Sequence, residues 1–165
     1  MHEGFSPVEI RHYEPSRYIE IADLFHGAIH AIDRSSYTDE QLEAWSPSPP
    51  DYERWRVRLA EKQPFMAVHR DAVVGFIELE DDGHIDCLYV HRDCQRRGIA
   101  GQLLTYAEQV ASQQGLNRLF VEASKVAMPL FERHGFHIVS ENRVKLNGQT
   151  LVNYRMEKTR ANTLA

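Results

Sequence analysis

The chain has 165 residues, of which 42% are hydrophobic and 26% charged, and a formal net charge of −5 at pH 7. This composition predicts one globular domain over residues 1–165 and excludes a disordered chain. The acidic balance argues against a nucleic-acid partner, because phosphate neutralisation needs a surplus of lysine and arginine. No apolar run approaches the ~20 residues of a membrane span, so we expect no membrane partner.

The beginning of the chain and its cysteines indicate a compartment. Met1–Phe5 lack the basic-then-apolar order of a signal peptide. The two cysteines, Cys87 and Cys94, are too few for a disulfide framework. We therefore expect a cytoplasmic protein whose thiols stay reduced.

The first part of the chain predicts one strand followed by helices. Residues 8–13 alternate between apolar and polar side chains, as a strand at the opening of a sheet does. Thr38 with Gln41 three residues later is typical of a capping box, and Asp51 can cap a further helix. The expected helices cover residues 16–32, 38–45 and 51–59.

The remainder predicts a meander of strands and then alternating helices and strands. Asp82-Gly83 and Asn147-Gly148 are pairs that favour hairpin turns, and Gly115 ends a long amphipathic helix. The expected strands are residues 65–68, 73–79, 85–90, 119–121, 136–139 and 151–156, with helices over 98–114 and 126–134. This order predicts the α/β class, with a central mixed, mostly antiparallel sheet flanked by helices.

A polar, basic segment leads from the central strand into the long helix. The N–H groups of a helix's first turn have no intrahelical acceptor, and the helix dipole makes this end positive, so it binds phosphate. Gly98 lets the backbone approach an anion, while Ala100 and Gly101 keep the next turn open. An ordinary surface turn is the alternative interpretation. The chain lacks the Gly-x-x-x-x-Gly-Lys-Ser/Thr and Gly-x-Gly-x-x-Gly patterns, which argues against nucleotide hydrolysis and a dinucleotide fold.

The run Gln95-Arg96-Arg97-Gly98-Ile99-Ala100 resembles the Gln/Arg-x-x-Gly-x-Gly/Ala signature with which the GNAT superfamily of N-acetyltransferases binds acyl-CoA. Residues 73–76, 88–90 and 131–136 resemble the flanking strands and the late helix with its Gly-Phe exit, and the element order matches from residue 8 to residue 156. The resemblance implies a GNAT-like fold, acetyl-CoA as co-substrate without a metal, and a small bacterial single-domain enzyme.

The resemblance also implies where the cofactor lies. Backbone N–H groups from Arg96 to Gly101 would hold the pyrophosphate, and the backbone of Leu88 and Val90 would pair with the pantetheine amides as a further strand would. Ser124 and the helix after it would face the other side of the pantetheine arm. The expected cofactor-binding residues are Leu88, Tyr89, Val90, Gln95, Arg96, Arg97, Gly98, Ile99, Ala100, Gly101, Ser124 and Phe131.

The implied reaction is direct transfer of an acetyl group from the thioester to a primary amine. It needs an acceptor for the ammonium proton and benefits from a donor to the departing thiolate. The usual donor of the family is a tyrosine in the late helix, but the matching residue here is Phe131, which has no hydroxyl. Tyr154 on the closing strand is the candidate substitute. Solvent as the donor, with Tyr154 only packed in the core, is the alternative.

Carboxylates on the central strands are the candidates for the base. Asp86 interrupts an apolar strand and is the first, with Glu78 and Glu122 on neighbouring strands as similar candidates. A purely structural, hydrogen-bonded Asp86 is an equally good interpretation. His84, two residues earlier, shares the face of Asp86. An intact strand would place Leu88 and Val90 on that face as well, whereas a bulge would not.

The nine histidines raise the question of a metal site. His26 and His30 lie one helical turn apart, but the residues between them lack the glutamate of a zinc-protease helix. His134 and His137 have no further ligands nearby in the sequence. We therefore expect structural or surface roles for both pairs and no metal.

The first helices and the closing hairpin are expected to shape the acceptor site. Their apolar surface favours a small-molecule amine with apolar character over a long basic peptide. The residues that supply this surface are Phe25, Ile29, Tyr37, Trp45 and Trp55. A homodimer formed through a sheet edge is compatible with the sequence.

Two other functions stay open. An acyl-CoA-binding regulatory or interaction module with weak or no transfer activity would fit Phe131, because this residue cannot protonate the leaving thiolate. A phosphate-binding α/β protein unrelated to CoA would require that the match at Gly135-Phe136 and the strand matches are coincidental. Turnover separates the first of these from an enzyme, since both bind CoA.

Overall fold

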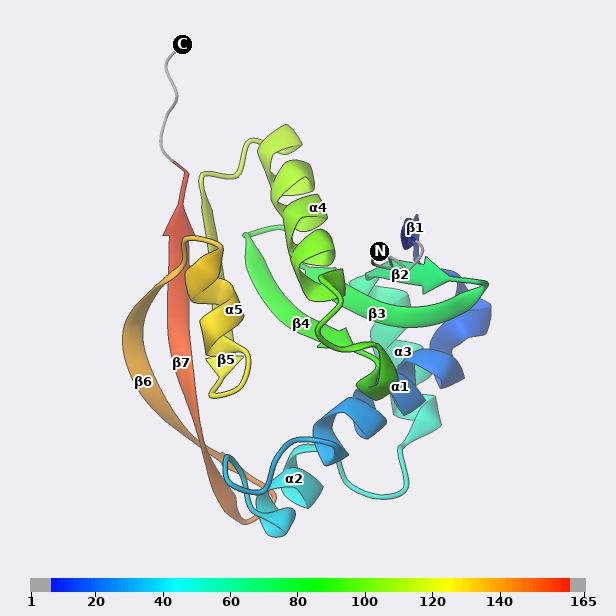
Figure 1. The fold of residues 1–165 in the computed structure, drawn as a ribbon, viewed down its shortest axis with the longest axis vertical. Helices are drawn as coiled ribbons and strands as arrows, with labels where there is room; N and C mark the ends of the chain where they lie inside the picture. Colours follow the sequence, from blue (N-terminus) through cyan, green and yellow to red (C-terminus); the bar gives the residue numbers. More distant parts are fainter. Residues whose placement is uncertain (1–6, 161–165) are drawn as a thin grey trace, which may run out of the picture.

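A seven-stranded sheet forms the centre of the computed structural model, which describes residues 7–160 (Figure 1). The strands are β1 (Glu9–His12), β2 (Phe65–His69), β3 (Ala72–Leu79), β4 (His84–Val90), β5 (Arg118–Ser124), β6 (His137–Leu146) and β7 (Gln149–Thr159). Their order across the sheet is β1-β2-β3-β4-β5-β7-β6, and all neighbours are antiparallel except the pair β4–β5. The predicted mixed, mostly antiparallel α/β sheet is confirmed.

Five helices accompany the sheet within the described residues. They are α1 (Tyr18–His30), α2 (Asp39–Trp45), α3 (Tyr52–Lys62), α4 (Ile99–Gln113) and α5 (Met128–Arg133), with 3-10 turns η1 (Pro15–Arg17) and η2 (Arg92–Cys94). Two of the helices, α2 and α3, begin at capping side chains. The Thr38 hydroxyl accepts the Gln41 N–H at 3.1 Å, and the Gln41 side chain accepts the Thr38 N–H at 2.9 Å. Asp51 accepts the Arg54 N–H at 3.0 Å. Both predicted caps are confirmed.

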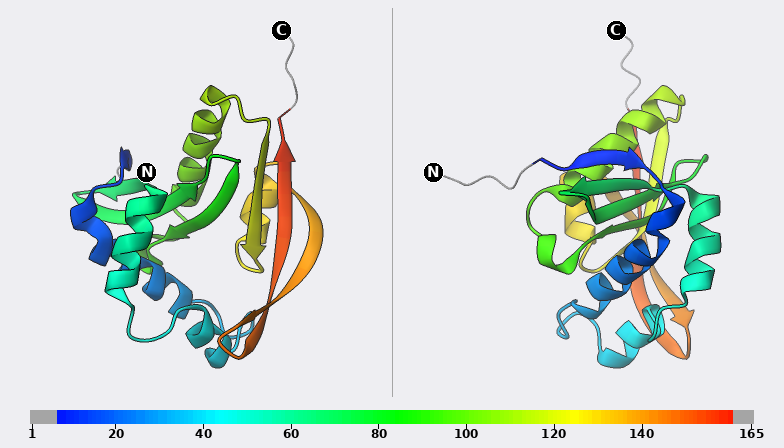
Figure 2. Two further views of the ribbon diagram at one scale, coloured as in Figure 1. Left: turned by 180° about the vertical axis from the view of Figure 1, so that it is seen from behind. Right: turned by 90° about the vertical axis from the view of Figure 1, so that its right-hand side faces the viewer.

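The helices cover opposite faces of the sheet, so the core has two parts (Figure 2). On one face, Ile99, Leu103 and Leu104 of α4 pack against Ile77 and Ile85 of the central strands, with Phe131 of α5 in the same cluster. On the other face, α1 and α3 pack on a second cluster that contains Met66, Phe76 and Cys87. Side chains of β4 therefore reach either the α4 face or the α1–α3 face.

The closing hairpin is longer than predicted. The strands expected at 136–139 and 151–156 extend to 137–146 and 149–159, and β7 inserts between β5 and β6. Most of β6 is exposed, so its sequence lacks the apolar alternation that predicts a strand. The turn itself is confirmed: Asn147 and Gly148 have φ of 47° and 81°, as a two-residue hairpin loop of this kind requires.

The parallel pair β4–β5 separates soon after it forms. The two strands share only the pairs His84↔Phe120 and Ile85↔Val121. A register shift in β3–β4 leaves Asp86 as an extra residue, because Glu78 pairs with Cys87 and Leu79 with Ile85. This is the bulge that the sequence analysis left open.

Some of the expectations concern residues that the structure does not describe. Met1–Phe5, from which we expect no signal peptide, lie outside the described residues, as do 161–165 of the predicted domain. Within residues 7–160, no helix has both the length and the apolar character to cross a bilayer.

Gly75 on β3 lies directly under α4, so we predict that a side chain at this position destabilises the fold. An added Cβ would meet Leu103 Cδ1 at 3.0 Å, Tyr89 O at 3.1 Å and Ile99 Cγ2 at 3.2 Å. We expect Gly75→Ala to lower the free energy of unfolding by about 1–3 kcal/mol. Thermal unfolding should show a lower Tm, by roughly 2–4 °C for each kcal/mol.

Gly27→Ala is the matched control. Gly27 lies in α1, and its added Cβ would meet only Arg92 Cδ at 3.7 Å, an ordinary contact. Alanine favours a helix over glycine by about 1 kcal/mol, so Tm should stay unchanged or rise. A Gly75→Ala protein with the same Tm as the wild type would show that α4 does not pack closely on β3.

Candidate functional site

A cavity of about 630 Å³ opens where β4 and β5 separate. The second half of β4 forms one wall and the end of β5 with α5 forms the other. The loop before α4, the C-terminal end of α1 and Trp45 of α2 also line it. The cavity therefore joins elements that are far apart in the sequence.

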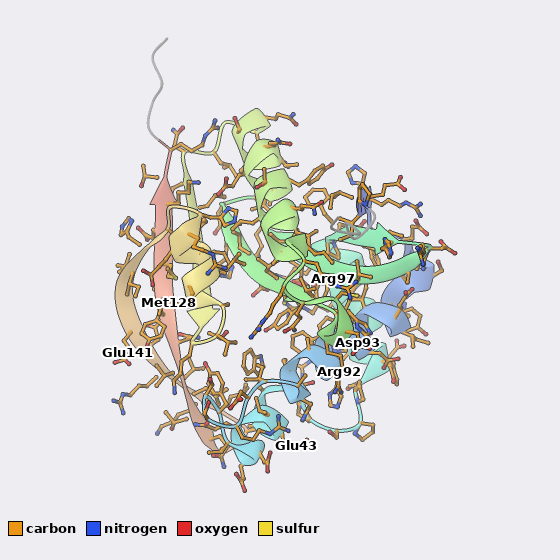
Figure 3. The ribbon with its side chains drawn as sticks, in the orientation of Figure 1. Glu43, Arg92, Asp93, Arg97, Met128 and Glu141 are labelled. Carbon is orange, nitrogen blue, oxygen red and sulfur yellow. The ribbon has the colours of Figure 1, made fainter. Side chains whose placement is uncertain are left out.

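All of the predicted cofactor-binding residues except Arg97 line this cavity within the described part of the chain. They are Leu88, Tyr89, Val90, Gln95, Arg96, Gly98, Ile99, Ala100, Gly101, Ser124 and Phe131. Figure 3 shows Arg97 beside the start of α4, with Arg92 and Asp93 on the preceding turn. The motif and the two separated strands are thus brought together in space.

The end of the cavity at α4 suits an anion. Gly98 precedes the helix with φ of 78°, and no side chain caps the first turn. An added Cβ on Gly98 would meet no atom within 4 Å, so the space beside it is open. The uncapped N–H groups and the side chains of Arg96 and Arg133 make this end positive. Phosphate groups fit here by charge and by hydrogen bonding.

Asp86, the first of the predicted catalytic residues, lines the cavity. Its Oδ2 lies 2.8 Å from Arg58 Nη2 and 3.1 Å from Lys62 Nζ, both on α3. Burial alone would raise the pKa of Asp86, but the hydrogen bond from Lys62 and the charge of Arg58 lower it below its usual value. Asp86 is therefore ionised at neutral pH.

Glu78 lies behind Asp86 and does not line the cavity. Its side chain has 0% exposure, and both oxygens accept hydrogen bonds from Arg58, at 3.2 and 2.8 Å. Burial raises the pKa of Glu78 in spite of that pairing with Arg58. Glu78 therefore contacts Arg58, which also binds Asp86, and is not in reach of a substrate in the cavity.

His84 stands at the point where β4 and β5 separate. Its Nδ1 lies 2.6 Å from Glu80 and its Nε2 2.5 Å from Glu122 on β5. Carboxylates only accept hydrogen bonds, so both ring nitrogens donate and the imidazole carries a positive charge. Burial alone would lower the pKa of His84, but the hydrogen bonds to Glu122 and Glu80 raise it.

The same corner holds side chains of metal-binding type. Ligand atoms of Glu80, His84 and Asp86 lie within 4.8 Å of one another. The Lys62 ammonium lies 3.1 Å from both Glu80 and Asp86, so a cation is already supplied by the chain itself. His26 and His30 instead hold the loop after α2: His26 Nδ1 lies 2.7 Å from Ser46 Oγ, and His30 Nε2 lies 2.8 Å from Ser46 O.

Tyr154 and Tyr89 differ in their relation to the cavity. Tyr154 on β7 packs against the core cluster under α4 and does not line the cavity. Tyr89 does line it, and its ring faces the α1 side, with centroids 4.7 Å from Phe25 and 6.4 Å from Trp45. Burial raises the pKa of Tyr89 well above its usual value, so its hydroxyl stays protonated. Phe131 forms part of the wall and contacts Phe136 edge-on at 5.1 Å.

The predicted acceptor surface reaches the cavity through Trp45 alone of its five members, among the described residues. Ile29 and Tyr37 are buried in a core cluster between α1, α2 and β7. The cavity is instead completed by Ala28, Ala31 and Ile32 from the end of α1 and the loop after it. Small and branched apolar side chains at this place carry no motif, so the sequence analysis missed them.

Arg58 and Lys62 on α3, like Arg133 on α5, are charged residues that the sequence analysis missed. Arg58 and Lys62 both pair with Asp86, and they are four residues apart on α3, so they lie on one helical face. Two signals in the sequence could have indicated these ion pairs: two basic residues four apart on one helix, and carboxylates within apolar strands. No pattern in the sequence predicts that this face of α3 packs against β3 and β4.

Comparisons with known proteins agree on one family. The model of the acetyltransferase (GNAT) domain matches residues 33–158. The uncharacterized N-acetyltransferase YafP of Escherichia coli (strain K12) is 33% identical over 149 residues, which cover 90% of this chain and 94% of YafP.

Solved structures share the fold. A GCN5-related N-acetyltransferase from Rhodopseudomonas palustris aligns with a TM-score of 0.89 at 31% identity, over 96% of this chain and 99% of that one. YncA from Salmonella typhimurium, solved with its cofactor acetyl-CoA, aligns with a TM-score of 0.65 at 20% identity, over 97% and 98% of the two chains.

We predict that His84 makes stability depend on pH. Because its pKa is raised from 6.5 in the folded chain, its contribution is complete below about pH 6.5 and disappears as pH rises through the folded value. Hydrogen bonds to charged groups contribute about 1.5–3 kcal/mol. His84→Gln should therefore lower the free energy of unfolding by that order at pH 6 and by less at pH 9. Urea unfolding of both proteins measures this, and an equal difference at both pH values would contradict it.

Proposed function

The chain belongs to the GNAT superfamily of acetyl-CoA-dependent N-acetyltransferases, and on this premise we propose that it acetylates the primary amine of a small molecule by direct attack on the thioester. One observation carries the proposal. A single cavity joins a positive helix start, suited to phosphates, to an ionised carboxylate at the point where β4 and β5 separate.

The residues present fit acetyl-CoA. The first-turn N–H groups from residue 98 to 101 and the side chains of Arg96 and Arg133 would hold its phosphates. The edge of β4 at Leu88 and Val90 has no strand partner on the cavity side within the described chain, so its backbone is available to the pantetheine amides. Acetyl-CoA supplies an activated acetyl group, and a backbone N–H of the same edge would polarise its carbonyl.

The acceptor end supports an amine with an apolar body. Ala28, Ala31, Ile32 and Trp45 line it on one side, and the Asp86 carboxylate lies on β4. An ammonium group is attracted to the carboxylate, while the remainder of the molecule would contact the apolar wall. The enclosure by α1 and α2 favours a small molecule over an extended peptide.

Proton transfer from the amine is assigned to Asp86. An ammonium is not a nucleophile, so it must lose a proton to Asp86, directly or through one water, before it attacks. Glu78 and Tyr154, which are also predicted catalytic residues, do not line the cavity, so we assign neither of them direct contact with the substrate. A CoA-like thiol has a pKa of roughly 8.5 by analogy with cysteine, so the thiolate can leave without a protein donor.

One observation favours a second function. Phe131 forms part of the cavity wall where the family usually has a tyrosine, and it has no proton to give. A module that binds acyl-CoA and transfers slowly or not at all would tolerate this residue. Release of free thiol with a panel of primary amines separates the two functions, because only the enzyme turns over.

We predict that Gly98→Glu abolishes CoA binding, because the new carboxylate occupies the open space at the positive helix start. Acetyl-CoA at about 100 times its Kd should add roughly 2.7 kcal/mol to the wild type, a rise of several degrees in Tm. CoA should act similarly and ATP should not. The variant should show no rise with any of the three.

Gly115→Glu is the matched control for this measurement. Gly115 has φ of 77° and open space beside it, so glutamate causes the same backbone strain, but it follows α4 at the end away from the cavity. It should keep the full rise in Tm with acetyl-CoA. Wild-type binding by Gly98→Glu would refute the assignment of this loop to the phosphates.

We predict that Asp86→Asn lowers kcat/KM by roughly 10²–10⁴-fold, the usual contribution of a general base. The rise in Tm with acetyl-CoA should persist, because Asp86 does not lie at the phosphate end. Asp81→Asn, in the exposed turn before β4, removes a carboxylate from the same hairpin and should leave kcat/KM unchanged. Asp86→Asn with wild-type turnover would exclude Asp86 as the base.

A further inference from the structure

One arginine of α3 reaches across two strands to the carboxylate that lines the cavity. Arg58 Nη2 lies 2.8 Å from Glu78 Oε2 and 2.8 Å from Asp86 Oδ2, and Arg58 Nε lies 3.2 Å from Glu78 Oε1. The guanidinium therefore holds Glu78 with two parallel hydrogen bonds and directs its remaining Nη2–H to Asp86. Only a planar, forked donor can make this set of contacts, and the ammonium of a lysine cannot.

Glu78 fixes the direction in which Arg58 points. Its carboxylate has 0% exposure, whereas the Arg58 side chain is 35% exposed. A buried carboxylate needs its cation, since no water can replace the lost hydrogen bonds. The guanidinium is also 5.8 Å from the ring of Trp55 on the same helix. Glu78 and Trp55 thus hold Arg58 in place independently of Asp86.

The bulge in β4 presents Asp86 to this arginine. A regular strand would place Asp86 on the α4 face with Leu88 and Val90, which pack against the α4 cluster. Because Asp86 is the extra residue, it and Cys87 both face α3, and Arg58 Nη2 lies 3.4 Å from Cys87 Sγ. The bulge turns the Asp86 carboxylate toward α3, and Arg58 then holds it there by a hydrogen bond.

We propose that Arg58 is the positioning residue for Asp86: anchored by Glu78, it holds Oδ2 and leaves Oδ1 directed to the amine in the cavity. The contacts of Asp86 with Arg58 and Lys62 both use Oδ2. The inference rests on the proposed function, because it explains how the base of that reaction is kept ionised and oriented.

Charged and titratable groups surround Asp86 on every side that packs against it. They are Arg58 and Lys62 from α3, Glu78 from β3, Glu80 from the turn after β3, His84 and Cys87 from β4, and Glu122 from β5. The positive charges of Arg58, Lys62 and His84 lower the pKa of Asp86, against the opposing effect of burial. Removing Arg58 should therefore raise the pKa of Asp86.

The test compares wild type with Arg58→Gln and Arg58→Lys. NMR titration of the Asp86 carboxyl carbon should show its midpoint at higher pH in Arg58→Gln, and the acid limb of kcat/KM should move the same way. Arg58→Lys keeps the charge without the fork. In Arg58→Lys, the acid limb of the kcat/KM profile should stay near its wild-type pH. The value of kcat should fall roughly 10–100-fold, because the Asp86 carboxylate is no longer held in place. The acetyl-CoA rise in Tm should survive in both.

Arg58→Gln leaves Glu78 buried without its cation, so it can fail to fold. The double variant Arg58→Gln/Glu78→Gln removes both charges. The Asp86 midpoint should move in the same direction but by less, because losing the negative charge of Glu78 opposes the loss of Arg58. Arg56→Gln is the matched control, because Arg56 pairs with Glu53 on the exposed side of the same helix. It should leave both the titration and the turnover unchanged.

The titration keeps this inference separate from the proposed function. An Asp86 midpoint that is the same in wild type, Arg58→Gln and the double variant would overturn the role of Arg58, whether or not amines are acetylated. A wild type that binds acetyl-CoA but acetylates no amine would overturn the proposed reaction, while the titration still decides whether Arg58 controls Asp86.

Discussion

The separation of β4 from β5 is the constraint on which the whole site depends. After two residue pairs the strands part, and β7 then holds β5 along its other edge, from Arg118 to Ser124. Beyond Ile85, β5 pairs with β7 and not with β4. The backbone N–H and C=O groups on this edge of β4 therefore have no hydrogen-bond partner in a neighbouring strand within the described residues. In the proposed function, the amide groups of the pantetheine arm would pair with this open edge and complete the sheet.

Groups of opposite charge lie at different places along this gap. The uncapped start of α4, with Arg96 and Arg133, makes one end positive, and Asp86 places a carboxylate farther along β4. These groups come from opposite faces of the sheet. The bulge at Asp86 allows this, because it turns one part of β4 toward α4 and the other toward α3. An anionic ligand and a cationic one can therefore meet across a single strand.

Side chains reinforce the two strand pairs at the apex of the gap. His84 on β4 hydrogen-bonds to Glu122 on β5, and Lys62 and Arg58 extend the ion pairs to α3. The network crosses the line where the two halves of the sheet meet. The alternating positive and negative groups offset part of the cost of burying charged side chains near the gap. The charge of Asp86 and the connection between the two halves of the sheet thus depend on the same contacts.

The sequence by itself determined the features whose causes are local. The Thr38–Gln41 cap, the Asn147-Gly148 turn and the Gly98 helix start each depend on neighbouring residues, so they could be predicted, and the motif with its element order identified the family. Only the tertiary structure decided that Arg58 holds Asp86, that Tyr154 lies outside the cavity, and that Trp45 alone of the predicted acceptor surface reaches it. These depend on strand register, on a one-residue bulge and on the packing of α3. Each arises from contacts between residues distant in the chain, which no local pattern encodes.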